Sequence, residues 1–393
     1  MEVKKKKNYI SGRESRRITR FNRRIMRKLE NARANANKDP NEYITKMKDD
    51  NNVVEFDNVH TFFFTDIGIV RAVDGVSFEI PKHSTVGVVG ESGCGKSVTS
   101  LSLMQLLQRP NGQVVGGEIR YNREDGTAYN IANVPNAVME KIRGNNISMI
   151  FQEPMTSLNP VFRIGMQVNE VLELHHPDWT EEQVKARTLE MLDMVGIANK
   201  EGVYKMYPHE LSGGMRQRVM IAIALACSPT LIIADEPTTA LDVTIQAQIL
   251  DLLQNLKDKV NSSIVLITHD LGVVAGMADY VVVMYAGRII EKGTANDIFH
   301  HPSHPYTIGL MKSKPVVGHK TDTLYNIPGN VPNPVNMPDY CYFRDRCEMR
   351  CEECKGEYPP SIKISDTHVV ACYRYLKEGE VIGYPKAVNV EEL

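Results

Sequence analysis

The sequence predicts an α/β domain with a largely parallel sheet, preceded by a basic segment and followed by a cysteine-bearing one. From Val53 onward, short apolar and β-branched runs alternate with longer helical segments, as α/β domains require. The chain has 393 residues, 42% hydrophobic and 24% charged, which is typical of globular proteins and excludes disordered and collagen-like classes. The most apolar run, residues 219–234, is interrupted by Ser228 and Pro229, so we expect no membrane-spanning helix. No apolar stretch follows the basic residues at the start, so we also expect no secretory signal.

Basic charge is concentrated in the N-terminal extension and linker, residues 1–52. Residues 1–50 contain 16 Lys and Arg against 7 Asp and Glu, a net +9, so the other 343 residues carry 30 against 41, a net −11. Ile18, Phe21, Ile25 and Leu29 recur at helical spacing, which predicts a basic amphipathic helix before a polar linker. Such a helix either attaches to anionic lipid or to a partner, or is a solvated tail; both readings remain open.

The central domain is expected over residues 53–300. One helix is predicted from the 3.6-residue spacing of its apolar residues, which indicates a face packed on the core: Ile245, Ile249, Leu252, Leu253 and Leu256. A hairpin is predicted over residues 280–292. Buried parallel strands are short, apolar and bounded by loops. The segments that meet this description are Thr85–Val89, Ile147–Phe151, Leu231–Ala234 and Ile264–Thr268.

A glycine-rich loop follows the first of these strands and precedes an apolar helical stretch, which is the P-loop pattern in its required context. Its glycines let the backbone approach a triphosphate, so that N–H groups and the helix N-terminus face the anion. Lys96 supplies a charge to the β and γ phosphates, and Ser97 supplies a hydroxyl for Mg²⁺. Cys94 is interpreted as a position that tolerates a small side chain rather than as a reactive thiol. The predicted phosphate-binding residues are Gly90, Glu91, Ser92, Gly93, Cys94, Gly95, Lys96, Ser97 and Val98.

Two carboxylates end the strand Leu231–Ala234. In a P-loop protein the first, Asp235, is placed to hold Mg²⁺ through water. The second, Glu236, then lies near the γ-phosphate and can accept a proton from an attacking water or orient it. The alternative is a surface strand end with two solvated acids, which the preceding P-loop disfavours.

A second glycine motif lies between these elements and reads Leu-Ser-Gly-Gly-Met-Arg-Gln over residues 211–217, ahead of a long helical stretch. Here the chain resembles the ATP-binding subunits of ABC transporters, whose signature is a Leu-Ser-Gly-Gly motif. The ordered set strengthens the resemblance, because Gln152 resembles the Q-loop, Ala240-Leu241-Asp242 the D-loop and His269 the switch histidine. The resemblance covers residues 53–300 and implies a P-loop NTPase of the ABC cassette type with a helical subdomain over about residues 156–220.

The resemblance also implies how the site works. Two ATPase domains of this family face each other, and each ATP lies between the P-loop of one and the signature of the other. Carried over, Glu236 is the catalytic base, His269 stabilises the γ-phosphate, and Gln152 senses the site and Mg²⁺. Residues that would bind nucleotide from the signature and D-loop are Ser212, Gly213, Gly214 and Asp242. An aromatic residue near the first strand stacks on adenine in this family; Phe63 is the choice among Phe62, Phe63 and Phe64, with a core phenylalanine as the alternative.

The C-terminal region, residues 301–393, narrows the family. Residues 298–307 resemble the segment that follows the ATPase core in oligopeptide and dipeptide permease subunits. His300 and His304 lie four residues apart, but the neighbouring prolines break any helix that would align them, so we interpret this segment as a structural turn.

Five of the seven cysteines fall between residues 341 and 372, which in a cytosolic protein argues for metal rather than disulfides. The spacing resembles the four-cysteine pattern of the permease family, which is associated with a [4Fe-4S] cluster; zinc is the alternative metal, and reduced, unmetallated cysteines are a third reading. Cys351 is an extra cysteine. The ligands that fit the pattern are Cys341, Cys347, Cys354 and Cys372.

The amino-acid sequence around the motifs is most similar to that of the D-type subunit of bacterial oligopeptide or dipeptide importers. This resemblance implies a second, F-type ATPase subunit, two transmembrane permease subunits, an extracytoplasmic peptide-binding protein, and a peripheral location on the cytoplasmic face of the membrane. The permease is expected to dock between the Q-loop and the signature, roughly residues 156–207. Two alternatives stay open: an importer for nickel or another small solute, and a soluble ABC ATPase acting on nucleic acid, for which the basic segment would be a phosphate-binding arm. No nucleic-acid partner is expected.

Overall fold

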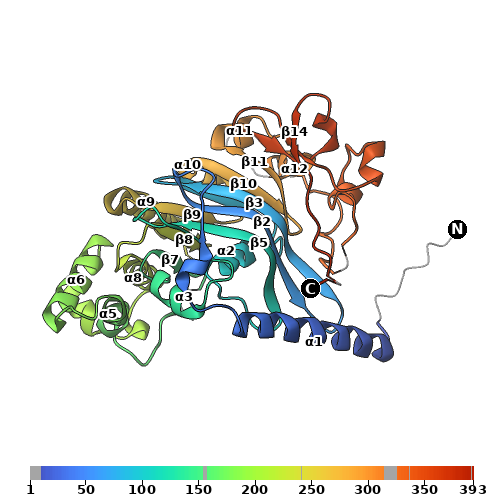
Figure 1. The fold of residues 1–393 in the computed structure, drawn as a ribbon. Helices are drawn as coiled ribbons and strands as arrows, with labels where there is room; N and C mark the ends of the chain where they lie inside the picture. The colour runs from blue at the N-terminus through green and yellow to red at the C-terminus, as the bar shows by residue number, and fades with distance from the viewer. Residues whose placement is uncertain (1–9, 154–156, 240, 314–324, 336, 391) are drawn as a thin grey trace.

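A computed structural model describes residues 10–153, 157–239, 241–313, 325–335, 337–390 and 392–393. Within these residues, two β-sheets are covered by helices, and a long N-terminal helix lies along one side of the molecule (Figure 1). The larger sheet has the strand order β14-β12-β13-β11-β10-β4-β9-β8-β7, and the smaller one has the order β1-β6-β5-β2-β3.

The strands of the larger sheet come from the centre and the C-terminal region of the chain. The middle of this sheet is parallel. Strand β4 pairs in parallel with β10 and β9, and β8 pairs in parallel with β9 and β7. The strands are β4 (Thr85–Val89), β7 (Ile147–Ile150), β8 (Leu231–Asp235), β9 (Ser263–Ile267), β10 (Tyr280–Tyr285), β11 (Arg288–Thr294), β12 (Ser361–Lys363), β13 (Val369–Val370) and β14 (Glu380–Gly383).

The smaller sheet is antiparallel. Its strands are β1 (Ile44–Thr45), β2 (Asn52–Phe64), β3 (Ile69–Pro81), β5 (Gly112–Asn122) and β6 (Ala128–Asn130). Residues 31–52, expected to be a polar linker, instead contain the last residues of the N-terminal helix, a short 3₁₀ helix, Pro40–Tyr43, and β1, which pairs with β6.

The helices cover the sheets and form a separate group between β7 and β8. The described α-helices are α1 (Gly12–Ala34), α2 (Lys96–Leu103), α3 (Asn136–Ile142), α5 (Ile164–His175), α6 (Glu181–Met194), α7 (Lys200–Lys205), α8 (Gly213–Leu225), α9 (Val243–Val260), α10 (Leu271–Met277), α11 (Ala295–His300) and α12 (Pro305–Lys312). Further 3₁₀ turns lie at Pro208–Glu210, Arg344–Arg346, Glu352–Lys355 and Tyr373–Tyr375. No described helix is long and apolar enough to cross a membrane.

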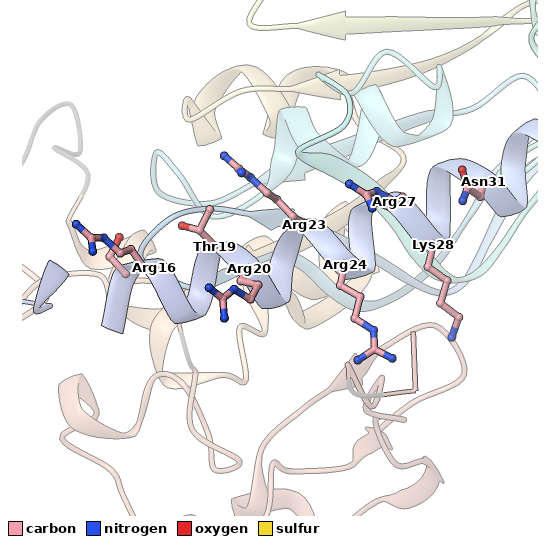
Figure 2. Close-up of a pocket in the computed structure, with 9 residues that line it drawn as sticks. Arg16, Thr19, Arg20, Arg23, Arg24, Arg27, Lys28 and Asn31 are labelled. Carbon is pink, nitrogen blue, oxygen red and sulfur yellow. The ribbon is translucent and has the colours of Figure 1, made fainter. Parts of the chain in front are cut away.

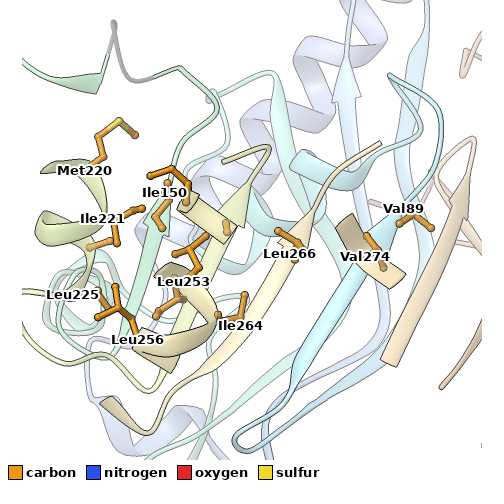
Figure 3. Packing of buried hydrophobic residues seen from close by; sticks show 14 of the residues in the cluster. Val89, Ile150, Met220, Ile221, Leu225, Leu253, Leu256, Ile264, Leu266 and Val274 are labelled. Atoms are coloured by element: carbon orange, nitrogen blue, oxygen red, sulfur yellow. The ribbon is translucent and has the colours of Figure 1, made fainter. Parts of the chain in front are cut away.

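The predicted strands and hairpin are confirmed to within a residue or two at their ends. The core explains why these runs are apolar. Ile150, Ile264 and Leu266 on the parallel strands pack against Leu253 and Leu256 of α9 and the neighbouring helices (Figure 3). Because these strands are buried on both faces, they read as continuous apolar runs. Their carboxyl ends meet at one edge of the sheet, and this brings distant polar residues together.

A buried ionic group ties the C-terminal region to both sheets. Asp74 of β3 accepts hydrogen bonds from Arg288 Nε at 3.0 Å and Nη2 at 2.6 Å, and from the Tyr342 hydroxyl at 2.8 Å. Its other oxygen lies 3.1 Å from His60 Nδ1. Burial by itself raises the pKa of Asp74, but the contacts with His60, Arg288 and Tyr342 outweigh it and hold that pKa below its ordinary value.

His304 has the structural role that the sequence predicts. It is buried, it caps the N-terminus of α12, and its Nδ1 accepts the backbone N–H of Tyr306 at 3.1 Å. Burial lowers the pKa of His304 to about 4, so the ring is neutral at physiological pH.

Candidate active site

The P-loop lies between β4 and α2 with the geometry of an anion-binding loop. Gly90 and Gly95 have φ of +153° and +104°, and a Cβ at Gly95 would lie 2.2 Å from the carbonyl oxygen of Ala72. Only glycine fits this backbone and this close approach. Lys96 Nζ donates to the carbonyls of Gly90 at 2.8 Å and Glu91 at 3.2 Å, so the ammonium group is held inside the loop.

Two oxygen donors for a hard cation meet beside the loop. Ser97 Oγ donates to Asp235 Oδ1 at 3.0 Å, although the two residues are 138 positions apart. Burial raises the pKa of Asp235 above that of an ordinary aspartate, and the carboxylate of Glu236 acts in the same direction. A hydroxyl and a carboxylate in this arrangement fit the oxygen ligands that Mg²⁺ prefers.

Glu236 is the centre of a second group at the same sheet edge. Its Oε2 accepts from Gln152 Nε2 at 3.1 Å and from Thr239 Oγ1 at 2.9 Å, and its Oε1 lies 3.3 Å from His269 Nδ1. Glu236 has φ of +46°, an uncommon conformation for a residue other than glycine. Gln152, Glu236 and His269 come from the ends of different strands, so the structure brings together three residues that the sequence placed more than 30 positions apart. Thr239 was not predicted, although it lies in the run between Glu236 and Asp242.

The signature and the D-loop lie together, apart from this group. Ser212 caps α8 by accepting from Met215 N, and Asp242 caps α9 by accepting from Ile245 N. A Cβ at Gly214 would lie 3.1 Å from Ile245 Cγ2, so the starts of α8 and α9 touch. Within the described residues, no hydrogen bond or ion pair joins Ser212, Gly213, Gly214 or Asp242 to the P-loop. Ala240 of the predicted D-loop lies outside the described residues.

The three phenylalanines near the first strand, Phe62, Phe63 and Phe64, differ in how deeply they are buried. Phe62 and Phe64 are buried and pack in one cluster with Ile25 of α1. Phe63 is half-buried, pairs across the sheet with Gly112 and covers it closely. Of the three, Phe63 therefore keeps an accessible ring, and its stacking on adenine stays a prediction.

Two C-terminal residues that the sequence did not single out hold the P-loop. Arg346 donates to Glu91 through Nη1 at 2.8 Å and Nη2 at 3.1 Å, a bidentate pair. The Tyr306 hydroxyl accepts the backbone N–H of Glu91 at 2.9 Å. The ring of Tyr306 packs with those of Tyr285 and Phe343, over which the Arg346 guanidinium also lies. These contacts span more than 200 positions, and no local pattern in the sequence could have indicated them.

The cysteines do not form the expected metal centre in this structure. Cys341, Cys354 and Cys372 are buried, Cys347 and Cys351 are half-buried, and the Sγ atoms of Cys351 and Cys354 lie 3.3 Å apart. Burial raises the pKa of Cys341 to about 12, and nearby thiols add to this. Yet no three His, Cys, Asp or Glu side chains in the described part of the chain are arranged to hold one ion. The predicted [4Fe-4S] cluster and the zinc alternative are therefore not supported.

Comparison with known proteins agrees with this geometry. Residues 73–239 match the ABC transporter family, and residues 290–354 match the C-terminal region of oligopeptide/dipeptide transporters. The chain is 50% identical over 327 residues to the oligopeptide transport ATP-binding protein AppD of Bacillus subtilis, covering 83% of this chain and 98% of AppD. It is 51% identical over 305 residues to OppD of Haemophilus influenzae, covering 78% and 92%. It is also 47% identical over 321 residues to the dipeptide transport protein DppD of Bacillus subtilis, covering 82% and 94%.

The fold is also that of a solved transporter cassette. The dimeric bacterial ABC transporter cassette MJ0796 superposes with a TM-score of 0.54 and is 27% identical, covering 62% of this chain and 98% of that chain. The other 38% of this chain lies outside that superposition. With the P-loop, the Glu236 group and these relatives in agreement, the chain is an ABC-type ATPase and belongs to the family of oligopeptide and dipeptide transport ATP-binding proteins.

Proposed function

We propose that the chain powers uptake of oligopeptides or dipeptides as the ATP-hydrolysing subunit of a bacterial ABC importer, peripheral on the cytoplasmic face of the membrane. The observation that carries this is the gathering of Gln152, Thr239 and His269 around Glu236, beside the P-loop, in a chain whose relatives are named for peptide transport. No residue of this chain is assigned to peptide binding, so the solute follows from the relatives alone.

In this proposal each side chain has one role in hydrolysis. Lys96 and the P-loop N–H groups bind the triphosphate, while Ser97 and Asp235 hold Mg²⁺, which neutralises phosphate charge when bound. Glu236 accepts the proton of the attacking water. Gln152 and His269 hold the Glu236 carboxylate in place, and His269 is exposed enough to reach the γ-phosphate.

A second cassette completes the nucleotide site in this proposal. Ser212, Gly213 and Asp242 are exposed, and Val243 beside them is 82% exposed, the highest value for a large apolar side chain in the described residues. A partner surface there would cover Val243 and offer its own P-loop to this signature. That this partner is a different, F-type ATPase subunit stays a prediction.

The permease is proposed to dock on the segment that leads into and forms α5. This segment exposes Val161 (71%), Phe162 (45%) and Met166 (54%), apolar side chains that a soluble surface does not usually gather. It falls within the expected docking region of residues 156–207, of which residue 156 lies outside the described residues. Two permease subunits and an external peptide-binding protein would complete the importer.

Reconstitution with the membrane subunits tests both the chemistry and the solute. In the Glu236→Gln variant we expect ATP hydrolysis to fall at least 100-fold with ATP binding retained, because the amide cannot accept the proton. The matched control is Glu124→Gln, an exposed glutamate between β5 and β6 and outside the expected docking region, which should hydrolyse ATP at the wild-type rate. Uptake of labelled dipeptides and oligopeptides by the complex, compared with uptake of Ni²⁺, identifies the solute. Hydrolysis at the wild-type rate in Glu236→Gln would refute the catalytic assignment, and uptake of Ni²⁺ alone would refute the peptide assignment.

A further inference from the structure

Helix α1 is docked on the cassette through its apolar side. Ile25 is 5% exposed and packs with Phe62 and Phe64, while Asn22 Nδ2 donates to the carbonyl of Thr65 at 2.7 Å. At the other end of the helix, Glu30 accepts from Gln113 Nε2 at 2.5 Å. The part of the apolar face around Ile25 is therefore covered by the same chain, while Phe21 stays 42% exposed, so most of this face is buried without insertion into a bilayer.

The opposite side of α1 is a row of arginines. Arg16, Arg20, Arg23 and Arg27 are spaced by four, three and four residues, which places them on the face away from Ile25. At a rise of 1.5 Å per residue this row is about 16 Å long. Arg24 and Lys28 flank it, and these six cations line a concavity of about 850 Å³ along the helix (Figure 2).

These arginines are not neutralised by the rest of the protein. Within the described residues, no ion pair or hydrogen bond joins the side chains of Arg16, Arg20, Arg23 or Arg27 to another residue, and all four are exposed. The whole helix carries nine basic residues against Glu14 and Glu30, a net +7. The chain beyond residue 50 has a net charge of −11, so an extended anion is attracted to α1 and repelled elsewhere.

We infer that the arginine row of α1, meaning Arg16, Arg20, Arg23 and Arg27, is a docking surface for the anionic headgroups of a lipid bilayer. A docked helix that carries four unpaired guanidinium groups on one side matches a planar array of lipid phosphates, each of which can accept a forked pair of hydrogen bonds. The contact adds to the attachment that the permease provides. This inference rests on the proposed function in one respect, namely that the importer places the chain next to a membrane.

A nucleic acid is the less suitable partner for this row. Proteins that bind single strands place aromatic rings between their cations so that bases can stack. The one aromatic residue of α1, Phe21, lies next to the apolar side rather than within the row. The remaining neighbours of the row are Ser15, Thr19 and Asn31, whose polar groups can donate hydrogen bonds to phosphates but cannot stack on bases.

The test is sedimentation of the purified full-length chain with vesicles. We expect binding to vesicles of 70% phosphatidylcholine and 30% phosphatidylglycerol at 0.1 M NaCl, and loss of binding at 0.5 M NaCl, because the screening length falls from about 10 Å to about 4 Å. Replacing the four arginines by glutamine should weaken binding about fivefold per residue, and so on the order of several hundredfold. The matched control replaces four exposed lysines outside α1, Lys141, Lys205, Lys355 and Lys377, and should bind within twofold of wild type.

Three outcomes would overturn the inference. They are equal binding to pure phosphatidylcholine vesicles, an unchanged affinity in the quadruple arginine variant, and tighter binding to an RNA oligonucleotide than to the anionic vesicles at the same salt. The melting temperature and basal ATPase rate of the variant should match wild type, since the replaced side chains touch neither the core nor the active site. Vesicle binding needs no hydrolysis. A chain that binds vesicles but transports no peptide therefore contradicts only the proposed function, and one that transports but does not bind contradicts only this inference.

Discussion

Replacing Arg346 by methionine should weaken ATP binding by leaving a carboxylate uncompensated in the P-loop. Glu91 is the second residue of the loop, and its carbonyl already accepts from Lys96, the ammonium that meets the phosphates. Its carboxylate is neutralised by the bidentate contact with Arg346, with N···O distances of 2.8 and 3.1 Å. Methionine keeps the apolar stem of the arginine but is shorter, so the change removes the charge, the fork of donors and the hydrogen bond from Nε to the carbonyl of Pro328.

The expected magnitude follows from the exposure of the pair. The side chains of Arg346 and Glu91 are 8% and 24% exposed, so the pair lies between a surface ion pair of about 0.2–1 kcal/mol and a buried one of about 3–5 kcal/mol. We expect a coupling of about 2 kcal/mol. For the ligand, two like unit charges about 10 Å apart repel by about 1.7 kcal/mol at an effective dielectric constant near 20. A single uncompensated carboxylate in the loop should therefore cost about tenfold or somewhat more in ATP affinity.

A double-mutant cycle read by calorimetric ATP titration separates charge from packing. Arg346→Met should raise the Kd for ATP about tenfold, Glu91→Gln should leave it nearly unchanged, and the double variant should return to within about threefold of wild type, because the amide no longer repels phosphate. The control is Lys355→Met, which removes a 63% exposed cation of the same region and should have no effect. If the double variant bound ATP as weakly as Arg346→Met alone, Arg346 would act through packing and the charge explanation would be wrong.

Three further changes test the architecture that holds the site. Asp74→Asn should lower the free energy of unfolding by about 3–5 kcal/mol in urea titrations. In the wild type, the stabilisation that Asp74 provides should be present above about pH 4 and should decline as the pH falls further. The reason is that the pKa of Asp74 is lowered in the folded state, so the unfolded chain binds the proton first. Gly95→Ala should abolish measurable ATP binding in the same calorimetric titration, since its Cβ would lie 2.2 Å from the carbonyl oxygen of Ala72, whereas Gly276→Ala, with nothing within 4 Å, should bind normally. Ile25→Asp should release α1, seen as faster amide exchange and trypsin cleavage along the helix, with ATP hydrolysis unchanged.

The sequence by itself determined the elements and the order of the chemical groups. Strands β4, β7, β8 and β9 could be predicted because each is a short apolar run buried on both faces, and such a run is a local property. The P-loop could be predicted for the same reason, since its glycines, lysine and serine are consecutive. Asp235, Glu236, Gln152 and His269 each end a predicted strand, and parallel strands place such residues at one edge.

Contacts between distant segments could not be predicted in this way. Arg346 and Glu91 are 255 positions apart. The residues around a single arginine in a C-terminal region rich in charged residues do not indicate which carboxylate it contacts. The same holds for Asp74, which is joined to residues up to 268 positions away. The cysteines show the opposite case, in which a local pattern predicts a contact that the structure does not contain. Their spacing resembles a four-ligand pattern, but in the described residues no three of them are placed to bind one metal ion.

Helix α1 combines a feature that the sequence determined with a feature that only the tertiary structure decided. Its periodicity determined a basic amphipathic helix, and α1 covers Gly12–Ala34 as a result. An apolar stripe has the same pattern whether it meets lipid, a partner or its own chain, because burial stabilises it equally in each case. Only the tertiary structure decided that Ile25 packs on Phe62 and Phe64, which leaves mainly the arginines, with Phe21 beside them, for whatever the helix binds.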